Sequence, residues 1–313
     1  MRKREDVKLY NDYNSYLKEK FGQKVYRIGL DAGFSCPNRD GTKGYGGCAY
    51  CNETGSRSSY TEPGRPVAEQ LKQRIQYLKT NKGAQKFIAY FQAFTNTYAH
   101  PEVLKRTYDN VLGFEEIVGI SIGTRPDAID RDKLEIISSY KKRYDVWIEY
   151  GAQSTHDRTL AGINRGHKFC DFVDAVGVTK EFGISICAHI IVGLPGESRN
   201  DIIDTAKKLS SLKINGVKIH LLHILKGSKY EQLYREGKIK VMGQGEYSEA
   251  VCDFLEHLSR DIIIQRLTGQ GAKQYHAAPD WAHDKTATIR QIEETLKTRK
   301  SFQGKLSDLS PVL

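Results

Sequence analysis

Residues 33–52, GFSCPNRDGTKGYGGCAYCN, follow a short apolar stretch and contain three of the six cysteines of the chain. Eleven residues separate Cys36 from Cys48, and two residues separate Cys48 from Cys51. The spacer is polar and rich in glycine, so it can wrap around a bulky inorganic group. Because thiolates are the protein ligands of zinc, copper(I) and iron–sulfur clusters, this segment predicts a metal centre.

The ligand count favours an iron–sulfur cluster over zinc. A structural zinc site takes four ligands, and the sequence offers no second cysteine pair, since Cys170, Cys187 and Cys252 stand apart. Three thiolates suit a four-iron cluster whose fourth iron stays open to a substrate or cofactor. A zinc knob remains the alternative. A disulfide pair is not expected, because the chain starts with a charged segment that lacks the apolar region of a signal peptide.

Length and composition bound the class of protein. The 313 residues are 39% hydrophobic and 27% charged, which is typical of a soluble globular protein with a core. No apolar run approaches the roughly 18 residues of a membrane span, so no membrane association is expected. Unpaired cysteines then predict a reducing cytoplasm. The net charge of +10 favours a polyanionic partner, with nucleic acid first, although a generally basic surface explains it equally well.

Strand and helix patterns alternate along the middle of the chain. Strands are expected at residues 24–31, 86–91, 116–122, 145–151, 184–192 and 216–222, with helices at 66–79, 101–111, 131–140, 168–182 and 199–212. Such alternation predicts a parallel sheet with right-handed crossovers, and the chemistry of such folds lies at the carboxyl ends of the strands. Six units in place of eight predict an α/β fold with an open, partial (β/α)6 barrel.

The flanking regions are expected to be helical. Residues 1–23 form an N-terminal helix over 5–22, residues 24–240 form the partial barrel, and residues 241–313 form a C-terminal helical extension that caps it. Within the extension the pattern predicts one long helix over 247–267, a loop over 269–284, a helix over 286–298 and a loose tail over 301–313.

Several motifs resemble those of the radical S-adenosylmethionine (radical SAM) superfamily. Besides the cysteines they are TRPD at 124–127, EYGAQS at 149–154, INRGH at 163–167 and GLPG at 193–196, and the similarity covers roughly residues 25–240. The long first cysteine gap departs from the usual CxxxCxxC spacing and is similar to that of the Elongator catalytic subunit. The whole-length pattern looks more like the YtqA/YhcC-type branch, since no acetyltransferase domain follows the barrel.

The resemblance implies a [4Fe–4S] cluster on Cys36, Cys48 and Cys51, with its open iron chelated by the amino and carboxylate groups of S-adenosylmethionine. It also implies a set of cofactor contacts: Tyr50, Gln92, Thr95, Thr124, Arg125, Gln153, Arg165, His189 and Gly193. Arg165 suits a carboxylate because its guanidinium binds bidentately. Structural roles compete with these, since Arg125 and Asp127 would also cap the next helix, and His189 would also fit the core of an apolar strand. Of His220 and His223, at most one is expected to face the cavity.

The resemblance further implies an enzyme that acts on tRNA at the C5 side chain of wobble uridine, for example converting carboxymethylaminomethyl-uridine to aminomethyl-uridine. An electron donor such as flavodoxin or ferredoxin would be its partner. Lys218, Lys226, Lys229 and Arg235 are candidates for phosphate contacts and Tyr275, His276 and Trp281 for base stacking, and solvated-surface and core-packing roles explain these residues equally well. Two alternatives stay open: the same chemistry on a peptide or small metabolite, and a zinc-stabilised RNA-binding protein.

Overall fold

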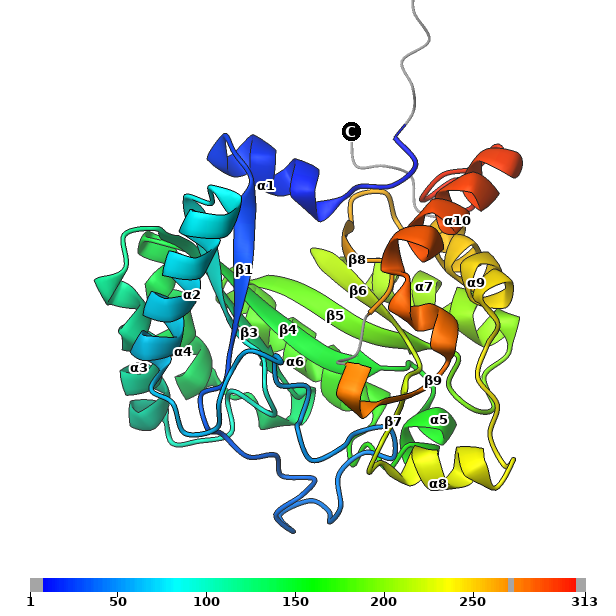
Figure 1. Cartoon of the computed structure of the whole chain (residues 1–313), viewed down its shortest axis with the longest axis horizontal. Coiled ribbons are helices and arrows are strands. Elements are labelled where there is room, and N and C mark those ends of the chain that lie inside the picture. The colour runs from blue at the N-terminus through cyan, green and yellow to red at the C-terminus, as the bar shows by residue number, and fades with distance from the viewer. Residues whose placement is uncertain (1–7, 270–272, 308–313) are drawn as a thin grey trace, which may run out of the picture.

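The computed structural model describes residues 8–269 and 273–307, which form a curled parallel sheet with helices packed on its outer face (Figure 1). The sheet has the order β1-β2-β3-β4-β5-β6-β8, and every neighbouring pair is parallel. Its strands are β1 (Val25–Leu30), β2 (Lys86–Phe91), β3 (Ile117–Thr124), β4 (Asp145–Gln153), β5 (Ser185–Val192), β6 (Gly216–Leu221) and β8 (Ile263–Arg266). The expected partial barrel is therefore confirmed.

Helices alternate with the strands, as predicted. They are α2 (Val67–Lys82), α3 (Pro101–Asp109), α4 (Arg131–Ser139), α6 (Phe169–Glu181) and α7 (Arg199–Ser211), followed by α9 (Gln244–His257) and α10 (Lys285–Thr298). Two short helices, α5 (Asp157–Gly162) and α8 (Lys229–Arg235), and a small antiparallel sheet of β7 (Ile224–Leu225) and β9 (His276–Ala278) were not predicted. The main hydrophobic core lies between the sheet and the longer helices α2, α3, α4, α6, α7, α9 and α10.

The number of strands differs from the prediction. The expected long helix over 247–267 ends at His257, and Ile263–Arg266 instead adds β8 as a seventh strand beside β6. Leu258 already has an extended backbone, and three consecutive isoleucines follow at 262–264. Branched residues of this kind favour a strand over a helix. The described part of the segment 241–313 therefore adds a strand to the sheet as well as helices.

The two ends of the described chain meet at the edge strand β8. Of the helix expected over 5–22, residues 5–7 lie outside the described residues, and helix α1 spans Tyr13–Phe21, where the Tyr13 ring packs 6.0 Å from that of Trp147. The segment 301–307 is not loose, since Gln303 is fully buried and its amide donates to the carbonyls of Ser259 and Ile262 at 2.7 and 2.8 Å. The rest of the predicted tail, 308–313, lies outside the described residues.

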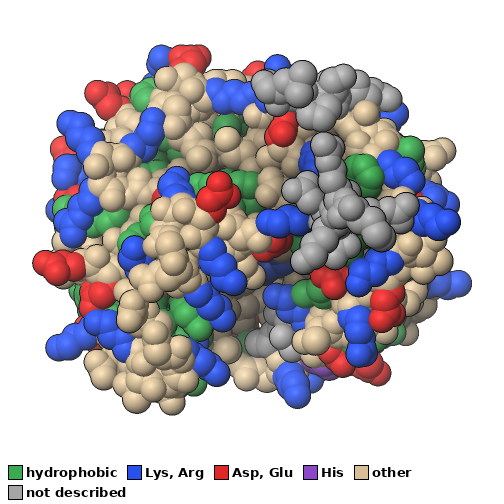
Figure 2. All heavy atoms as spheres, turned by 90° about the horizontal axis from the view of Figure 1, so that it is seen from above, with side chains coloured by type: hydrophobic (Ala, Val, Ile, Leu, Met, Phe, Trp, Pro, Cys, Tyr) green, Lys and Arg blue, Asp and Glu red, His purple; other side chains and the backbone are tan. Residues whose placement is uncertain are grey.

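The surface is rich in basic side chains. Figure 2 shows lysines and arginines spread over one face, several of them around a hollow near its centre, with fewer acidic side chains between them. Within the described residues, no helix combines the length and the apolar character needed to cross a membrane.

Candidate active site

One cavity of about 640 Å³ opens at the carboxyl ends of the strands, and all three motif cysteines line it. The cysteine loop follows β1 and is fastened to the segment 163–167. Asn38, buried in the loop, donates to the carbonyl of Asn164 at 2.6 Å, and the Asn164 amide donates to the carbonyl of Gly47 at 2.8 Å. Gly47 has φ +78°, a backbone conformation that favours glycine. The long spacer between Cys36 and Cys48 is thus an ordered part of the cavity wall.

The thiols receive hydrogen bonds from cationic side chains. Arg165 Nη1 donates to Cys48 Sγ at 3.4 Å, and Arg39 Nη2 donates to Cys51 Sγ at 3.1 Å. Burial opposes ionisation of Cys48, but the charge and hydrogen bond of Arg165, together with smaller contributions from Tyr50 and Arg125, outweigh it and lower the pKa of this thiol. At Cys51 burial prevails and raises the pKa, although Arg39 opposes it. Donors of this kind suit the sulfur ligands of an iron–sulfur cluster, whose potential depends on hydrogen bonds to the sulfurs.

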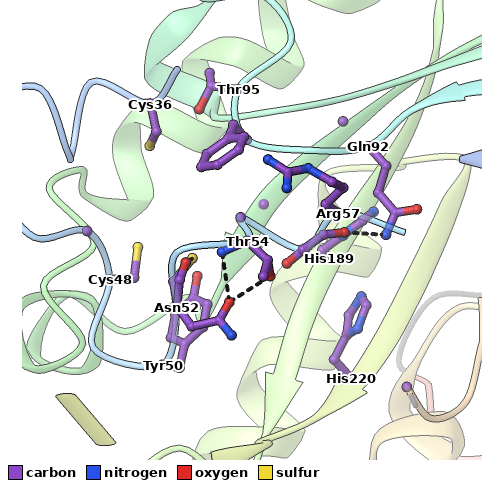
Figure 3. Close-up of a pocket in the computed structure, with 18 of the residues that line it drawn as sticks. Cys36, Cys48, Tyr50, Asn52, Thr54, Arg57, Gln92, Thr95, His189 and His220 are labelled. Atoms are coloured by element: carbon purple, nitrogen blue, oxygen red, sulfur yellow. Dashed lines mark hydrogen bonds between the residues drawn. The ribbon is translucent and has the colours of Figure 1, made fainter. Parts of the chain in front are cut away.

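All six cysteines are free thiols. In residues 8–269 and 273–307, no three side chains of His, Cys, Asp or Glu are grouped closely enough to hold a metal ion as they stand. The three motif thiols therefore share one cavity without converging on a single point. Figure 3 shows Cys36 and Cys48 on one side of this cavity, with His189 and His220 across from them.

The structure brings eight of the nine expected cofactor contacts to the cavity wall: Tyr50, Gln92, Thr95, Thr124, Arg125, Gln153, Arg165 and His189. The exception is Gly193, which is not part of the lining. Its φ is +94°, and a side chain there would meet the sulfur of Met242 at 3.4 Å. Its position therefore reflects a tight turn packed against Met242, and its expected contact with the cofactor stays a prediction.

Two arginines are already engaged by protein groups. Arg165 directs both Nε and Nη2 at the carbonyl of Gly151, at 3.2 and 2.7 Å, so its bidentate face is not turned to a ligand carboxylate. Arg125 makes a bidentate ion pair with Asp127, with distances of 2.8 and 2.9 Å. Asp130, not this pair, caps α4, which contradicts the alternative role considered for Arg125.

A polar layer crosses the inside of the barrel around Glu149, which is 1% exposed. Its carboxylate pairs with Arg27 of β1 and Lys218 of β6, accepts a hydrogen bond from Ser121 of β3 and lies 2.8 Å from Nε2 of His189. Burial raises the pKa of Glu149, but Arg27 and Lys218 outweigh it and hold that pKa well below the ordinary value. Five strands are thus tied together by one carboxylate.

Lys218 was expected to meet RNA phosphates, and this is wrong. It is 2% exposed, and burial and the neighbouring Arg27 lower the pKa of its ammonium to about 7, although Glu149 opposes this. Lys226, Lys229 and Arg235 are exposed, on or next to α8. This helix contacts the cysteine loop, where the amide of Tyr230 donates to the carbonyl of Ala49 at 2.9 Å.

The histidines and aromatic residues also depart in part from expectation. Both His220 and His223 line the cavity, because β6 ends at Leu221 and the chain turns between them. Tyr275 lines the cavity as well. His276 and Trp281 do not, and Trp281 instead donates to the carbonyl of Met242 at 3.0 Å and packs 5.6 Å from Tyr247.

Sequence reasoning missed several lining residues, among them Arg39, Arg57, Tyr90, Glu149 and Arg266. The sequence did contain a signal for Glu149 and Lys218. A charged residue inside an otherwise apolar strand indicates a buried partner of opposite charge. Arg266 could not be placed while its segment was assigned to a helix.

The comparisons define the class of protein. The radical SAM superfamily model matches residues 36–209 and its C-terminal domain model matches 214–298, so the chain belongs to the radical SAM superfamily. It is a radical SAM enzyme, and this family uses a [4Fe–4S] cluster and S-adenosylmethionine.

Within that superfamily the chain is 41% identical to YtqA of Bacillus subtilis, covering 95% of this chain and 92% of YtqA. It is 34% identical to YhcC of Escherichia coli, over 92% and 93%. Among solved structures, archaeal Elp3 of Methanocaldococcus infernus matches with a TM-score of 0.68 at 16% identity, over 89% of this chain and 64% of Elp3. A tRNA uridine(34) acetyltransferase of Dehalococcoides mccartyi is 24% identical over 48% of this chain and 33% of its own length.

Proposed function

We propose that Cys36, Cys48 and Cys51 hold the [4Fe–4S] cluster and that the enzyme modifies the C5 side chain of wobble uridine in tRNA, in the cytoplasm. When bound, the cluster and S-adenosylmethionine supply one-electron reduction and hydrogen-atom abstraction. The observation that carries the cluster assignment is the meeting of the three thiols in one cavity, with Arg39 and Arg165 as donors to sulfur.

The protein's own side chains would bind and orient S-adenosylmethionine and would shield the cavity from water. Tyr50, Gln92, Thr95, Thr124 and Gln153 would contact S-adenosylmethionine from neighbouring strand ends. The Glu149 layer would close the floor of the cavity, because its carboxylate and the side chains of Arg27 and Lys218 bind one another inside the barrel. Flavodoxin or ferredoxin would deliver the electron.

Three observations support tRNA as the substrate. A tRNA uridine(34)-acting relative aligns with half of the chain, although at low identity. The net charge of +10 favours a polyanion. Exposed Lys226, Lys229 and Arg235 lie beside the cysteine loop, where they could contact phosphates while a splayed base entered the cavity. We propose the conversion of carboxymethylaminomethyl-uridine to aminomethyl-uridine as the reaction.

Nucleoside analysis of tRNA from a strain that lacks the gene tests this proposal. Carboxymethylaminomethyl-uridine should accumulate, and the aminomethyl nucleoside and its derivatives should be lost. The wild-type gene should restore the profile, Cys48→Ala should not, and Cys170→Ala should serve as the control because Cys170 lies outside the cavity lining. An unchanged profile would refute tRNA as the substrate and favour a peptide or small metabolite.

A further inference from the structure

Arg266, the last residue of β8, is a cation in the cavity wall that forms no ion pair with a described side chain. Within residues 8–269 and 273–307, no hydrogen bond or ion pair joins its guanidinium to another side chain. Burial is the main influence and lowers the pKa of Arg266, and Arg27 adds to this, while Tyr90 and Glu149 oppose it without a direct contact. The Arg266 side chain is only half-buried, so its guanidinium is partly withdrawn from water and still reachable from the cavity, where it would favour an anion.

The other arginines of the cavity lining each have a partner. They are Arg39 with the carbonyl of Asn52 and Cys51, Arg57 with Asp31, Arg125 with Asp127, and Arg165 with the carbonyl of Gly151 and Cys48. Glu149 is the one carboxylate among the described lining residues, and Arg27, Lys218 and His189 already surround it. No protein carboxylate of this lining is left for Arg266.

The neighbourhood of Arg266 also offers a neutral polar group. His220 Nε2 is buried without a hydrogen-bond partner among the described residues. Burial is the main reason that the pKa of His220 lies well below its ordinary value, and Arg266 adds to it. The imidazole is therefore neutral and can donate one hydrogen bond without adding charge. A guanidinium beside one such donor fits a carboxylate, which accepts bidentately from arginine.

Arg266 lies beside the strand that carries His220, since Arg266 pairs with Lys218 of β6. The sheet curls so far that its edge strands β1 and β8 also meet, where Arg27 Nη1 donates to Gln265 Oε1 at 2.9 Å. His220 lies across the cavity from Cys36 and Cys48 (Figure 3). An anion bound at Arg266 would therefore face the thiols from the far wall, as the reacting part of a substrate would.

We propose that Arg266 and His220 form a subsite for a carboxylate of the substrate, and hence that the uridine side chain that reacts carries a free carboxylate. This inference rests on the proposed function. It adds a specificity-determining residue, and it excludes the neutral amide of the same side chain as an equal substrate.

Two synthetic anticodon stem–loops test it, one with carboxymethylaminomethyl-uridine at the wobble position and one with the corresponding carboxamide. Binding to the reconstituted enzyme is measured by fluorescence anisotropy, and KM and kcat are measured for each RNA. Wild type should bind the carboxylate RNA about 10-fold or more tightly than the carboxamide, as expected for a charge-assisted pair. Arg266→Gln should bind the two equally, and Arg266→Lys should keep part of the preference.

Arg131→Gln is the matched control, because Arg131 is exposed and pairs with Glu181 far from the cavity. Circular dichroism checks that each variant is folded. Undiminished discrimination in Arg266→Gln would overturn the subsite while leaving the proposed function intact. A parallel loss of S-adenosylmethionine affinity in Arg266→Gln would also overturn it, because the ligand would then be the cosubstrate. Wild-type enzyme that neither binds nor converts either RNA would refute the proposed function and the subsite with it.

Discussion

At the scale of single residues, the interior of the barrel depends on one carboxylate. Glu149 is surrounded by Arg27, Lys218 and His189, so removing its charge would leave two buried cations unpaired. Breaking a buried ion pair in this way lowers the free energy of unfolding far more than the loss of an exposed pair does.

We expect Glu149→Gln to lower the free energy of unfolding of the iron-free protein by about 3–5 kcal/mol. Urea denaturation measures this change. Glu181→Gln is the control, because Glu181 forms an exposed pair with Arg131, and it should change stability by less than about 1 kcal/mol. Equal, small effects of both changes would contradict the role given to Glu149.

The low pKa of Asp127 predicts that the free energy of unfolding depends on pH. Burial raises its pKa, but hydrogen bonds and charge from Arg125 outweigh this and bring the pKa to about 2. Since the folded pKa lies below the unfolded value of about 3.9, Asp127 stabilises the fold above pH 4 and loses this effect as the pH falls towards 2. Asp127→Asn should lower the free energy of unfolding by about 2 kcal/mol at pH 7 and by roughly half of that at pH 3. A pH-independent difference in urea denaturation would argue against the ion pair.

At the scale of elements, the periodic part of the chain was predictable and the compact C-terminal part was not. Alternating apolar strands and amphipathic helices fix a parallel sheet, and the motifs at the strand ends then meet in one cavity. The spacing of apolar residues around 262–264 fits a helix, but pairing with β6 makes this segment a strand. Arg266 was missed and Lys218 was misplaced for the same reason, since their surroundings are set by segments distant in sequence.

Hydrogen exchange tests the seventh strand. The amide of Ile263 donates to the carbonyl of Asn215 at 3.0 Å, and that of Ile264 donates to the carbonyl of Asn11 at 2.7 Å. We expect both amides to exchange as slowly as those of β6, because opening them requires separating the edge of the barrel. The exposed Asp261 amide is the internal control. Fast exchange at Ile263 and Ile264 would mean that β8 is not part of the stable sheet.

At the scale of the whole molecule, the excess of positive charge should govern RNA binding. Affinity for tRNA should fall by on the order of 10-fold or more between 50 and 200 mM salt, since each neutralised phosphate releases counterions. Replacing Lys226, Lys229 and Arg235 together by glutamine should weaken binding and flatten the slope of log K against log salt. Filter binding measures both.

The matched control replaces three exposed basic residues on α2 and α3, Lys72, Lys105 and Arg106, by glutamine. It removes the same charge from helices on the outer side of the barrel. An equal change in slope for both triple variants would show that total charge, and not the surface next to the cysteine loop, controls the binding of tRNA.

The central claim is that three thiols around one cavity hold a four-iron cluster. The most direct measurement is the iron and zinc content of anaerobically reconstituted protein, with Cys36→Ala, Cys48→Ala and Cys51→Ala beside a Cys170→Ala control. The account predicts about four irons per chain for wild type and Cys170→Ala, and loss of iron in each of the other three variants. One zinc and no iron, or full iron loading without a cavity cysteine, would contradict it.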